Sequence, residues 1–173
     1  MAKAKLQKRQ YVMFVAGLLA LVTGLSVLAV FVCRRISRDI RRERLMQEHV
    51  ALEIPDLHIK APVLEGTDNE VLSQAAGHFP GTGRLGSGNY CIAGHSSTIY
   101  KEYFNNLKNA EVGMEIDLCD AGQKHYTYKV AEMFIVEPNE VWILDDFDDD
   151  RVTIVTCTDD GTKRRIVVGM LAE

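Results

Sequence analysis

Cysteine is scarce in this sequence: there are four, and no two of them form a C-x-x-C pair. No cysteine stands at a spacing from a histidine that resembles a zinc site. The number of cysteines is compatible with one disulfide. The stronger interpretation is a set of unpaired thiols, at least one of which is reactive. The four are Cys33, Cys91, Cys119 and Cys157.

The folded part of the chain has no excess of basic residues, because lysine and arginine crowd into the first 44 residues. The formal net charge is -4, and the remainder of the chain is correspondingly acidic. A nucleic-acid-binding domain needs basic residues spread over a folded face, so this class of partner is excluded. Charged residues make up 25% and hydrophobic residues 47%, which predicts one domain with a real core and little disorder.

No charged residue interrupts the 23 residues from Tyr11 to Cys33. A helix of this length is roughly 35 Å long, against about 30 Å for the hydrocarbon core of a membrane. A buried helix of a soluble domain is rarely apolar on every face for so long. A cleaved signal peptide fits less well, because the run is too long and lacks a small-x-small cleavage site. We therefore predict a transmembrane helix over residues 11–33, after a basic cytoplasmic tail over residues 1–10.

The basic residues beside this helix conflict with an extracellular domain. The positive-inside rule counts both flanks, and the richer C-terminal flank alone would keep the following domain in the cytoplasm. Residues 34–50 mix basic and acidic residues, and we interpret them as a charged juxtamembrane helix or linker beside anionic lipid. The flanking cations are Lys3, Lys5, Lys8 and Arg9 before the helix, and Arg34, Arg35, Arg38, Arg41, Arg42 and Arg44 after it.

Short β-like runs separated by glycine-rich turns fill residues 51–173. Many short strands at this spacing predict a small closed barrel or a sandwich. Two stretches have a helical pattern, one over Asn69–Ala76 after the candidate N-cap Asp68, and one over Tyr100–Leu107. The predicted strands cover Leu57–Lys60, Ala61–Leu64, Asn89–Ala93, Glu115–Cys119, His125–Val130, Glu132–Val136, Arg151–Val155 and Arg165–Met170.

A small set of residues is suited to thiol chemistry. Cys157 ends a β-like run before a polar turn, which favours access to its sulfur, whereas a cysteine within a strand more often fills a core. The reactive species is the thiolate, which a cationic neighbour stabilises. His95 similarly follows a short run and Gly94, and Arg164 or Arg165 opens the run across the turn from Cys157. A guanidinium there could stabilise an oxyanion, although spacing alone is weak evidence for such a constellation.

Three segments carry a resemblance to the sortase family of cysteine transpeptidases. TIVTC at 153–157 resembles the sortase TLxTC motif, with Ile154 in place of leucine. IAGHSS at 92–97 resembles the segment that bears the catalytic histidine, and GHFPGTGRLGSGNYCIAGH at 77–95 is similar to the run before it. Arg164 stands five residues before Gly169 and matches the family's arginine, with Arg165 as the alternative. The resemblance covers roughly residues 51–171.

This resemblance implies a mainly β fold: an eight-stranded closed β-barrel with short helices, forming a catalytic domain over residues 51–173. Cys157 would attack the Thr–Gly carbonyl of an LPxTG-like sorting signal, His95 would act as general acid and base, and Arg164 would hold the oxyanion. The thioacyl-enzyme would pass its acyl group to an amine on a cell-wall precursor or a pilin lysine. The protein would span the cell membrane once, with its catalytic domain outside.

Three further residues are predicted to contact the substrate: Thr156 beside the nucleophile, Ala93 before the histidine, and Trp142 as part of a groove wall. The implied chemistry needs no metal or other cofactor. An acidic cluster is a candidate calcium site, but a solvated loop or charged rim is the preferred interpretation. GHFPGT at 77–82 favours the class D sortases or a related group. The cluster comprises Asp145, Asp146, Asp148, Asp149 and Asp150.

Other functions are compatible with the same residues. With water as the acceptor, the site would make the chain an extracellular cysteine endopeptidase. Without catalysis, the chain would be a membrane-tethered barrel that binds peptides. The arginine-rich flank adds a third alternative, a domain that faces the cytoplasm.

Overall fold

A computed structural model of the chain describes residues 2–96 and 103–172, with side chains from Tyr11 onward. Helix α1 (Ala2–Glu48) runs without interruption through the predicted tail, membrane span and linker. It contains the one helical segment in these residues that is long and apolar enough to cross a membrane, judged by length and composition. The chain divides into two compact units, Met1–Arg41 and Arg42–Glu173, so the last turns of α1 belong to the unit that holds the strands.

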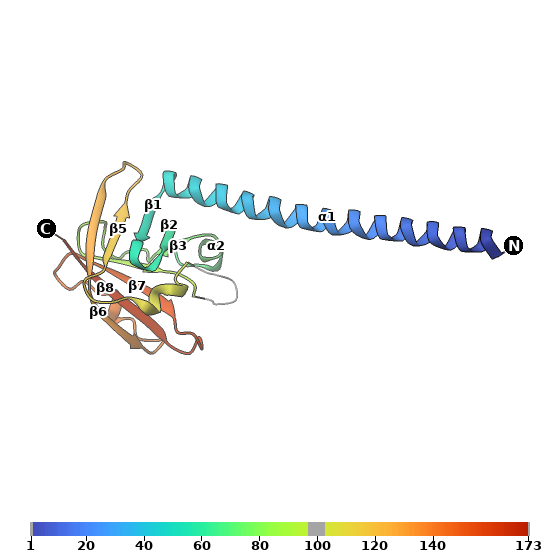
Figure 1. The fold of residues 1–173 in the computed structure, drawn as a ribbon. Coiled ribbons are helices and arrows are strands. Elements are labelled where there is room, and N and C mark those ends of the chain that lie inside the picture. Colours follow the sequence, from blue (N-terminus) through green and yellow to red (C-terminus); the bar gives the residue numbers. More distant parts are fainter. Residues whose placement is uncertain (1, 97–102, 173) are drawn as a thin grey trace. The chain divides into compact units, whose positions relative to one another are not determined.

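Eight strands form a closed barrel (Figure 1), which confirms the predicted fold class. Around the barrel they are hydrogen-bonded in the order β1-β2-β3-β4-β7-β8-β6-β5. The pairs β2–β3 and β4–β7 are parallel, and β7–β8 is antiparallel. The strands are β1 (Val50–Ile54), β2 (Ile59–Glu65), β3 (Ala76–His78), β4 (Asn89–Ala93), β5 (Glu115–Cys119), β6 (His125–Val136), β7 (Arg151–Cys157) and β8 (Arg164–Leu171).

Short helices lie between the strands: η1 (Pro55–Leu57), α2 (Asn69–Leu72), η2 (Asn105–Asn109) and η3 (Trp142–Leu144). Asp68 is the N-cap of α2, as predicted, because its carboxylate accepts hydrogen bonds from the next turn of backbone. The predicted helix over Asn69–Ala76 is too long, since Ala76 begins β3 and pairs with β2. Of the predicted helix over Tyr100–Leu107, residues 100–102 lie outside the described residues, and the remainder leads into η2.

Two strand predictions were wrong in detail. The run Leu57–Lys60 is not one strand, because η1 ends at Leu57 and His58 adopts a left-handed conformation with φ 52° before β2 begins. The runs His125–Val130 and Glu132–Val136 form one strand, β6, with an irregular register between Val130 and Glu132. This irregularity bends the strand and explains why the sequence pattern breaks there.

The barrel interior is filled by aliphatic and aromatic side chains contributed by strands on all sides. Burial of each large side chain stabilises the fold by about 1.5–3 kcal/mol. Gly169 of β8 faces this core, where a Cβ would lie 3.0 Å from side-chain atoms of Ile116 and Val152. Glycine therefore lets β8 approach the core. Fully buried interior residues include Leu52, Ile54, Ile92, Ile116, Leu118, Tyr128, Ile154 and Val167.

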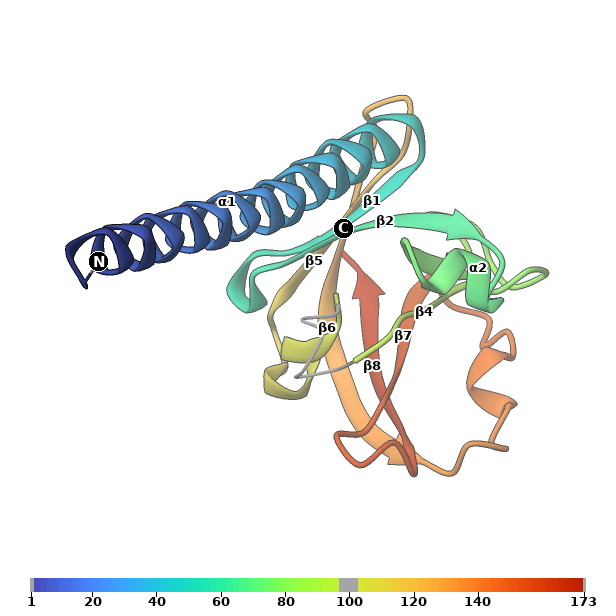
Figure 2. The same ribbon diagram turned by 90° about the vertical axis from the view of Figure 1, so that its right-hand side faces the viewer.

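A second, smaller apolar cluster lies on the outer face of the sheet, under the connection between β6 and β7 (residues 137–150). Figure 2 shows this connection, in orange, passing beside β7 outside the barrel. Asn89, which is 1% exposed, fastens it by donating to the carbonyls of Ile143 at 3.0 Å and Asp145 at 2.8 Å. The Asn89 amide oxygen accepts from Thr153 at 2.7 Å. The cluster itself comprises Ile143, Val155, Ile166 and Val168.

Candidate active site

The turn between β7 and β8 brings Cys157 and Arg164 opposite each other. Cys157 ends β7, Arg164 begins β8, and the two are partners in the antiparallel register. The pair Val155–Ile166 lies two residues further into the sheet. Because side chains alternate between the faces of a strand, Cys157 and Arg164 share the face of Val155 and Ile166. That face is the outer one, since Val155 and Ile166 belong to the outer cluster.

Arg165 lies on the opposite face from Arg164. It is the cross-strand partner of Thr156, one residue out of phase with Cys157. The next residue on the same face of β8 is Val167, which belongs to the interior core. Of the two adjacent arginines, Arg164 is therefore the one on the face of the Cys157 thiol.

His95 follows β4, the parallel neighbour of β7. Ala93 is the partner of Val155, and the N–H of Gly94 donates to the carbonyl of Val155 at 3.1 Å. His95 comes two residues after Ala93 on one segment, and Cys157 comes two residues after Val155 on the other. Neighbouring strands are about 4.8 Å apart, so the segments that carry the two residues leave the sheet side by side at one edge of the barrel. His95 is exposed and Cys157 is partly buried, which leaves both within reach of a substrate.

Three contacts fix the backbone around His95. The hydroxyl of Thr156 donates to the carbonyl of Gly94 at 2.7 Å, which joins the ends of β4 and β7. The N–H of Phe104 donates to the carbonyl of His95 at 3.2 Å. The fully buried ring of Phe104 fills the space that a Cβ on Gly94 would need, so only glycine fits there without displacing the ring. Gly94 is part of the IAGHSS segment, whereas Phe104 belongs to none of the segments that resemble sortase motifs.

The β7–β8 turn is closed by its own polar residues. The N–H of Thr158 donates to the carbonyl of Lys163 at 3.1 Å. The carboxylate of Asp160 accepts from the hydroxyls of Thr158 and Thr162 at 2.5 and 2.8 Å. These hydrogen bonds, that of Thr158 first, lower the pKa of Asp160 to about 2, so it stays charged near neutral pH. A closed turn keeps the two ends of the hairpin in register.

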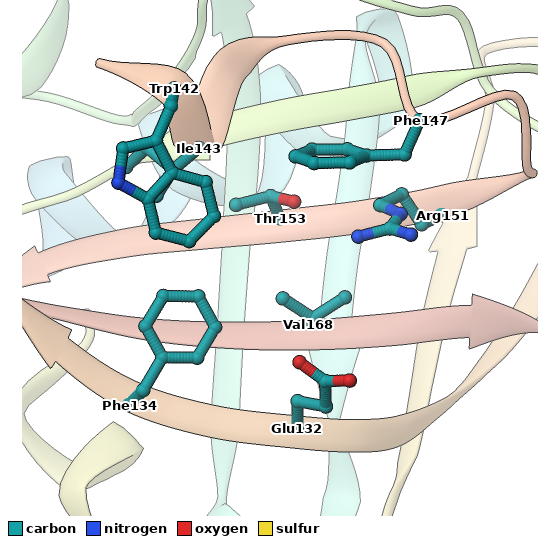
Figure 3. Close-up of a pocket in the computed structure, with 8 residues that line it drawn as sticks. All are labelled: Glu132, Phe134, Trp142, Ile143, Phe147, Arg151, Thr153 and Val168. Carbon is teal, nitrogen blue, oxygen red and sulfur yellow. The ribbon is translucent and has the colours of Figure 1, made fainter. Parts of the chain in front are cut away.

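A cavity of about 140 Å³ opens on the outer face beneath the 137–150 connection (Figure 3). Trp142 stacks on Phe134 with ring centroids 5.7 Å apart and is 44% exposed. Phe134 is the partner of Ile166, so the cavity begins one residue pair along the same face from the pair of Cys157 and Arg164. The lining residues are Glu132, Phe134, Trp142, Ile143, Phe147, Arg151, Thr153 and Val168.

The three predicted substrate contacts occupy different environments. Trp142 borders the cavity. Ala93 ends β4 and is 9% exposed, and Thr156 is 3% exposed, with its hydroxyl bonded to the backbone. Thr156 thus joins two strand ends, and it has little surface for a ligand. The contacts of all three residues with a substrate stay predictions.

The four cysteines are free, in agreement with the interpretation as unpaired thiols. Cys91 is fully buried in β4, and burial raises the pKa of its thiol to about 12, so it stays neutral and unreactive. Cys119 ends β5, two strands away from β8 around the barrel, and Cys33 is exposed on α1. Cys157 pairs across strands with Arg164, and it ends the strand that neighbours β4, which precedes His95.

Two carboxylates of the acidic cluster, those of Asp149 and Asp150, form an ion pair or a hydrogen bond with residues next to the 137–150 connection. Asp149 forms an ion pair with Arg151, and hydrogen bonds from this guanidinium lower the pKa of Asp149. Asp150 accepts from the N–H of Gly88 at 2.9 Å. Across residues 2–96 and 103–172, no group of three or more His, Cys, Asp or Glu side chains is arranged to hold a metal. The contacts of Asp149 and Asp150 join the end of the 137–150 connection to β7 and to the residue before β4.

Residues 52–172 match the family model described as the sortase domain. The chain belongs to the sortase family. Sortase A of Streptococcus agalactiae is 35% identical to it over 123 residues, which are 68% of this chain and 49% of that protein. Sortase A of Bacillus anthracis is 29% identical over 122 residues, which are 69% of this chain and 58% of that protein. This sortase thus spans about half the length of the curated relatives it matches.

Solved sortase structures share the fold. A class D sortase transpeptidase from Clostridium perfringens is 30% identical, with a TM-score of 0.66 over 78% of this chain and 89% of that one. Sortase A of Listeria monocytogenes is 27% identical, with a TM-score of 0.68 over 73% of this chain and 88% of that one. Because structures named sortase A, C and D match to a similar degree, membership of class D stays a prediction.

Proposed function

We propose that this sortase is a cysteine transpeptidase with Cys157 as nucleophile, His95 as general acid and base, and Arg164 as the oxyanion ligand. The observation that carries the proposal is the cross-strand pair of Cys157 and Arg164, beside the parallel strand β4, which ends two residues before His95. The substrate class is an LPxTG-like sorting signal. The acceptor is an amine, on a cell-wall precursor or a pilin lysine.

In the first half-reaction, the Cys157 thiolate attacks the carbonyl carbon between the threonine and glycine of the signal. A C–S bond forms, and the carbonyl oxygen takes up negative charge, to which the Arg164 guanidinium donates hydrogen bonds. The C–N bond then breaks, and the His95 imidazolium gives its proton to the leaving amine. The product is a thioester between the threonine acyl group and Cys157.

In the second half-reaction, the acceptor amine attacks the thioester carbon and loses a proton to the neutral His95 imidazole. The C–S bond breaks as the new C–N bond forms, and Cys157 leaves as the thiolate. Arg164 again donates to the oxygen while it carries negative charge. The closed β7–β8 turn supports both steps, because its hydrogen bonds hold the backbone at the start of β8.

Product analysis separates this function from the alternatives. The full chain is incubated with a fluorogenic LPxTG peptide and increasing concentrations of triglycine. We expect the ligated fraction of the product to rise with triglycine, because the amine competes with water for one thioester. Hydrolysis alone at every amine concentration would favour a cysteine endopeptidase. Absence of any cleavage would favour the non-catalytic peptide-binding barrel.

We also propose that α1 anchors the enzyme in the cell membrane, with the barrel on the outer side. The uncharged run within this helix supports the anchor, and the chemistry of the proposed substrates supports the outer side. The arginine-rich flank argues for the opposite orientation. Protease added to intact cells is expected to digest the barrel and spare the N-terminal tail. A protected barrel would mean that the domain faces the cytoplasm.

A further inference from the structure

Residues 103–109, which we call the strap, connect the two sides of the proposed active site. At the start of the strap, the N–H of Phe104 donates to the carbonyl of His95 at 3.2 Å. Near its end, Lys108 Nζ pairs with Asp159 Oδ2 at 3.0 Å, just beyond the nucleophile. The position of the strap therefore influences the backbone of the histidine directly.

Arg42, near the end of α1, holds the first residue of the strap. Its Nε donates to the hydroxyl of Tyr103 at 2.7 Å, and its guanidinium carbon lies 4.0 Å from the centre of the tyrosine ring. The same hydroxyl donates to the carbonyl of Gln74 at 2.9 Å. Arg42 is partly buried and belongs to the same compact unit as the strands, whereas Arg41 and Arg44 are exposed.

We propose that Arg42 is a positioning residue for His95, so that the last turns of α1 form part of the active-site scaffold. The chain of contacts runs from Arg42 to Tyr103, then along the backbone to Phe104, whose N–H and ring hold His95 and Gly94. This inference rests on the proposed function of His95. A general acid displaced by about 1 Å loses much of its effect, because proton transfer depends on geometry.

Removal of Arg42 takes away a charged hydrogen-bond donor and a stacked cation from Tyr103. The Cys157–Arg164 pair is held mainly by the β7–β8 turn itself, which the strap contacts through the Lys108–Asp159 ion pair, a weak surface contact. We therefore expect Arg42→Ala to lower kcat by about tenfold and to leave KM within about twofold of the parent value. Arg44→Ala removes the same charge from an exposed position of the same helix and is expected to leave both constants unchanged.

The experiment uses the full chain in detergent micelles and measures peptide cleavage and the rate of Cys157 alkylation by iodoacetamide. The alkylation rate is compared among the parent, Arg42→Ala, His95→Ala and the double variant. If Arg42 acts through His95, Arg42→Ala slows alkylation in the parent but has no further effect in His95→Ala. Tyr103→Phe keeps the ring but loses the hydroxyl, and its kcat is expected to fall between those of the parent and Arg42→Ala.

Two kinetic results would overturn the inference: kinetics of Arg42→Ala that match those of Arg44→Ala, or alkylation that Arg42→Ala slows equally with and without His95. A third result concerns stability. If Tyr103→Phe lowers the melting temperature as much as Arg42→Ala does but keeps the parent kcat, the contact serves stability alone and the inference is overturned. An inactive parent chain would instead overturn the proposed function. The alkylation comparison would still decide whether Arg42 acts on His95.

Discussion

Replacement of Cys157 by alanine is expected to lower kcat/KM for cleavage of an LPxTG-like peptide by at least about 10³-fold. The reason is that the thioester cannot form without a thiolate at the end of β7. The remaining thiols cannot substitute for it: Cys91 is fully buried, and Cys119 lies on a different part of the barrel. The release of a fluorescent product by the full chain measures the loss.

Cys119→Ala is the matched control, because it removes a partly exposed thiol from another strand end. We expect this variant to cleave the peptide at the parent rate. Cleavage retained in Cys157→Ala, with loss in Cys119→Ala, would move the nucleophile to β5 and contradict the site described above.

The second large effect is expected at Arg164. Substitution by lysine keeps the positive charge but removes the planar fork that donates two parallel hydrogen bonds to an oxyanion. We expect Arg164→Lys to lower kcat by about 10²-fold, which is in the range for loss of an oxyanion ligand. The measurement is steady-state kinetics of peptide cleavage at saturating acceptor amine.

Arg165→Lys provides the matched control, because the same substitution is made one residue away on the opposite face of β8. Its kcat is expected to stay within about threefold of the parent value, and the melting temperatures of both variants should agree. A larger loss of kcat in Arg165→Lys than in Arg164→Lys would contradict the assignment of Arg164 to the face of the Cys157 thiol.

Several elements were predictable because local patterns dictate them. Glu115–Cys119 alternates and Asn89–Ala93 is mostly apolar, and both form strands with the predicted bounds. Asp68 has a side chain suited to an N-cap, and it caps α2. By contrast, β1 (Val50–Ile54) was missed, because charged residues continue almost to its start and mask its two-residue period.

Within the site, the sequence predicted only those residues that lie in or near a recognisable motif. TIVTC and IAGHSS identify Cys157 and His95 as candidates. The spacing from Gly169 favours Arg164 over Arg165, and the register that pairs Arg164 with Cys157 adds a physical reason for this order. The burial of Thr156 follows from the same alternation and could have been inferred once Cys157 was assigned to the outer face. The contact of Arg42 with Tyr103 joins residues 61 positions apart, and no local pattern predicts it.

Mass spectrometry of the enzyme trapped during turnover tests the central claim most directly. The full chain is mixed with an LPxTG-like peptide in the absence of acceptor amine, quenched in acid, and digested. The account predicts a peptide adduct, ending in the threonine acyl group, on the fragment that contains Cys157 and on no other cysteine. Turnover of the peptide without any adduct on Cys157, or with the adduct on another residue, would contradict it.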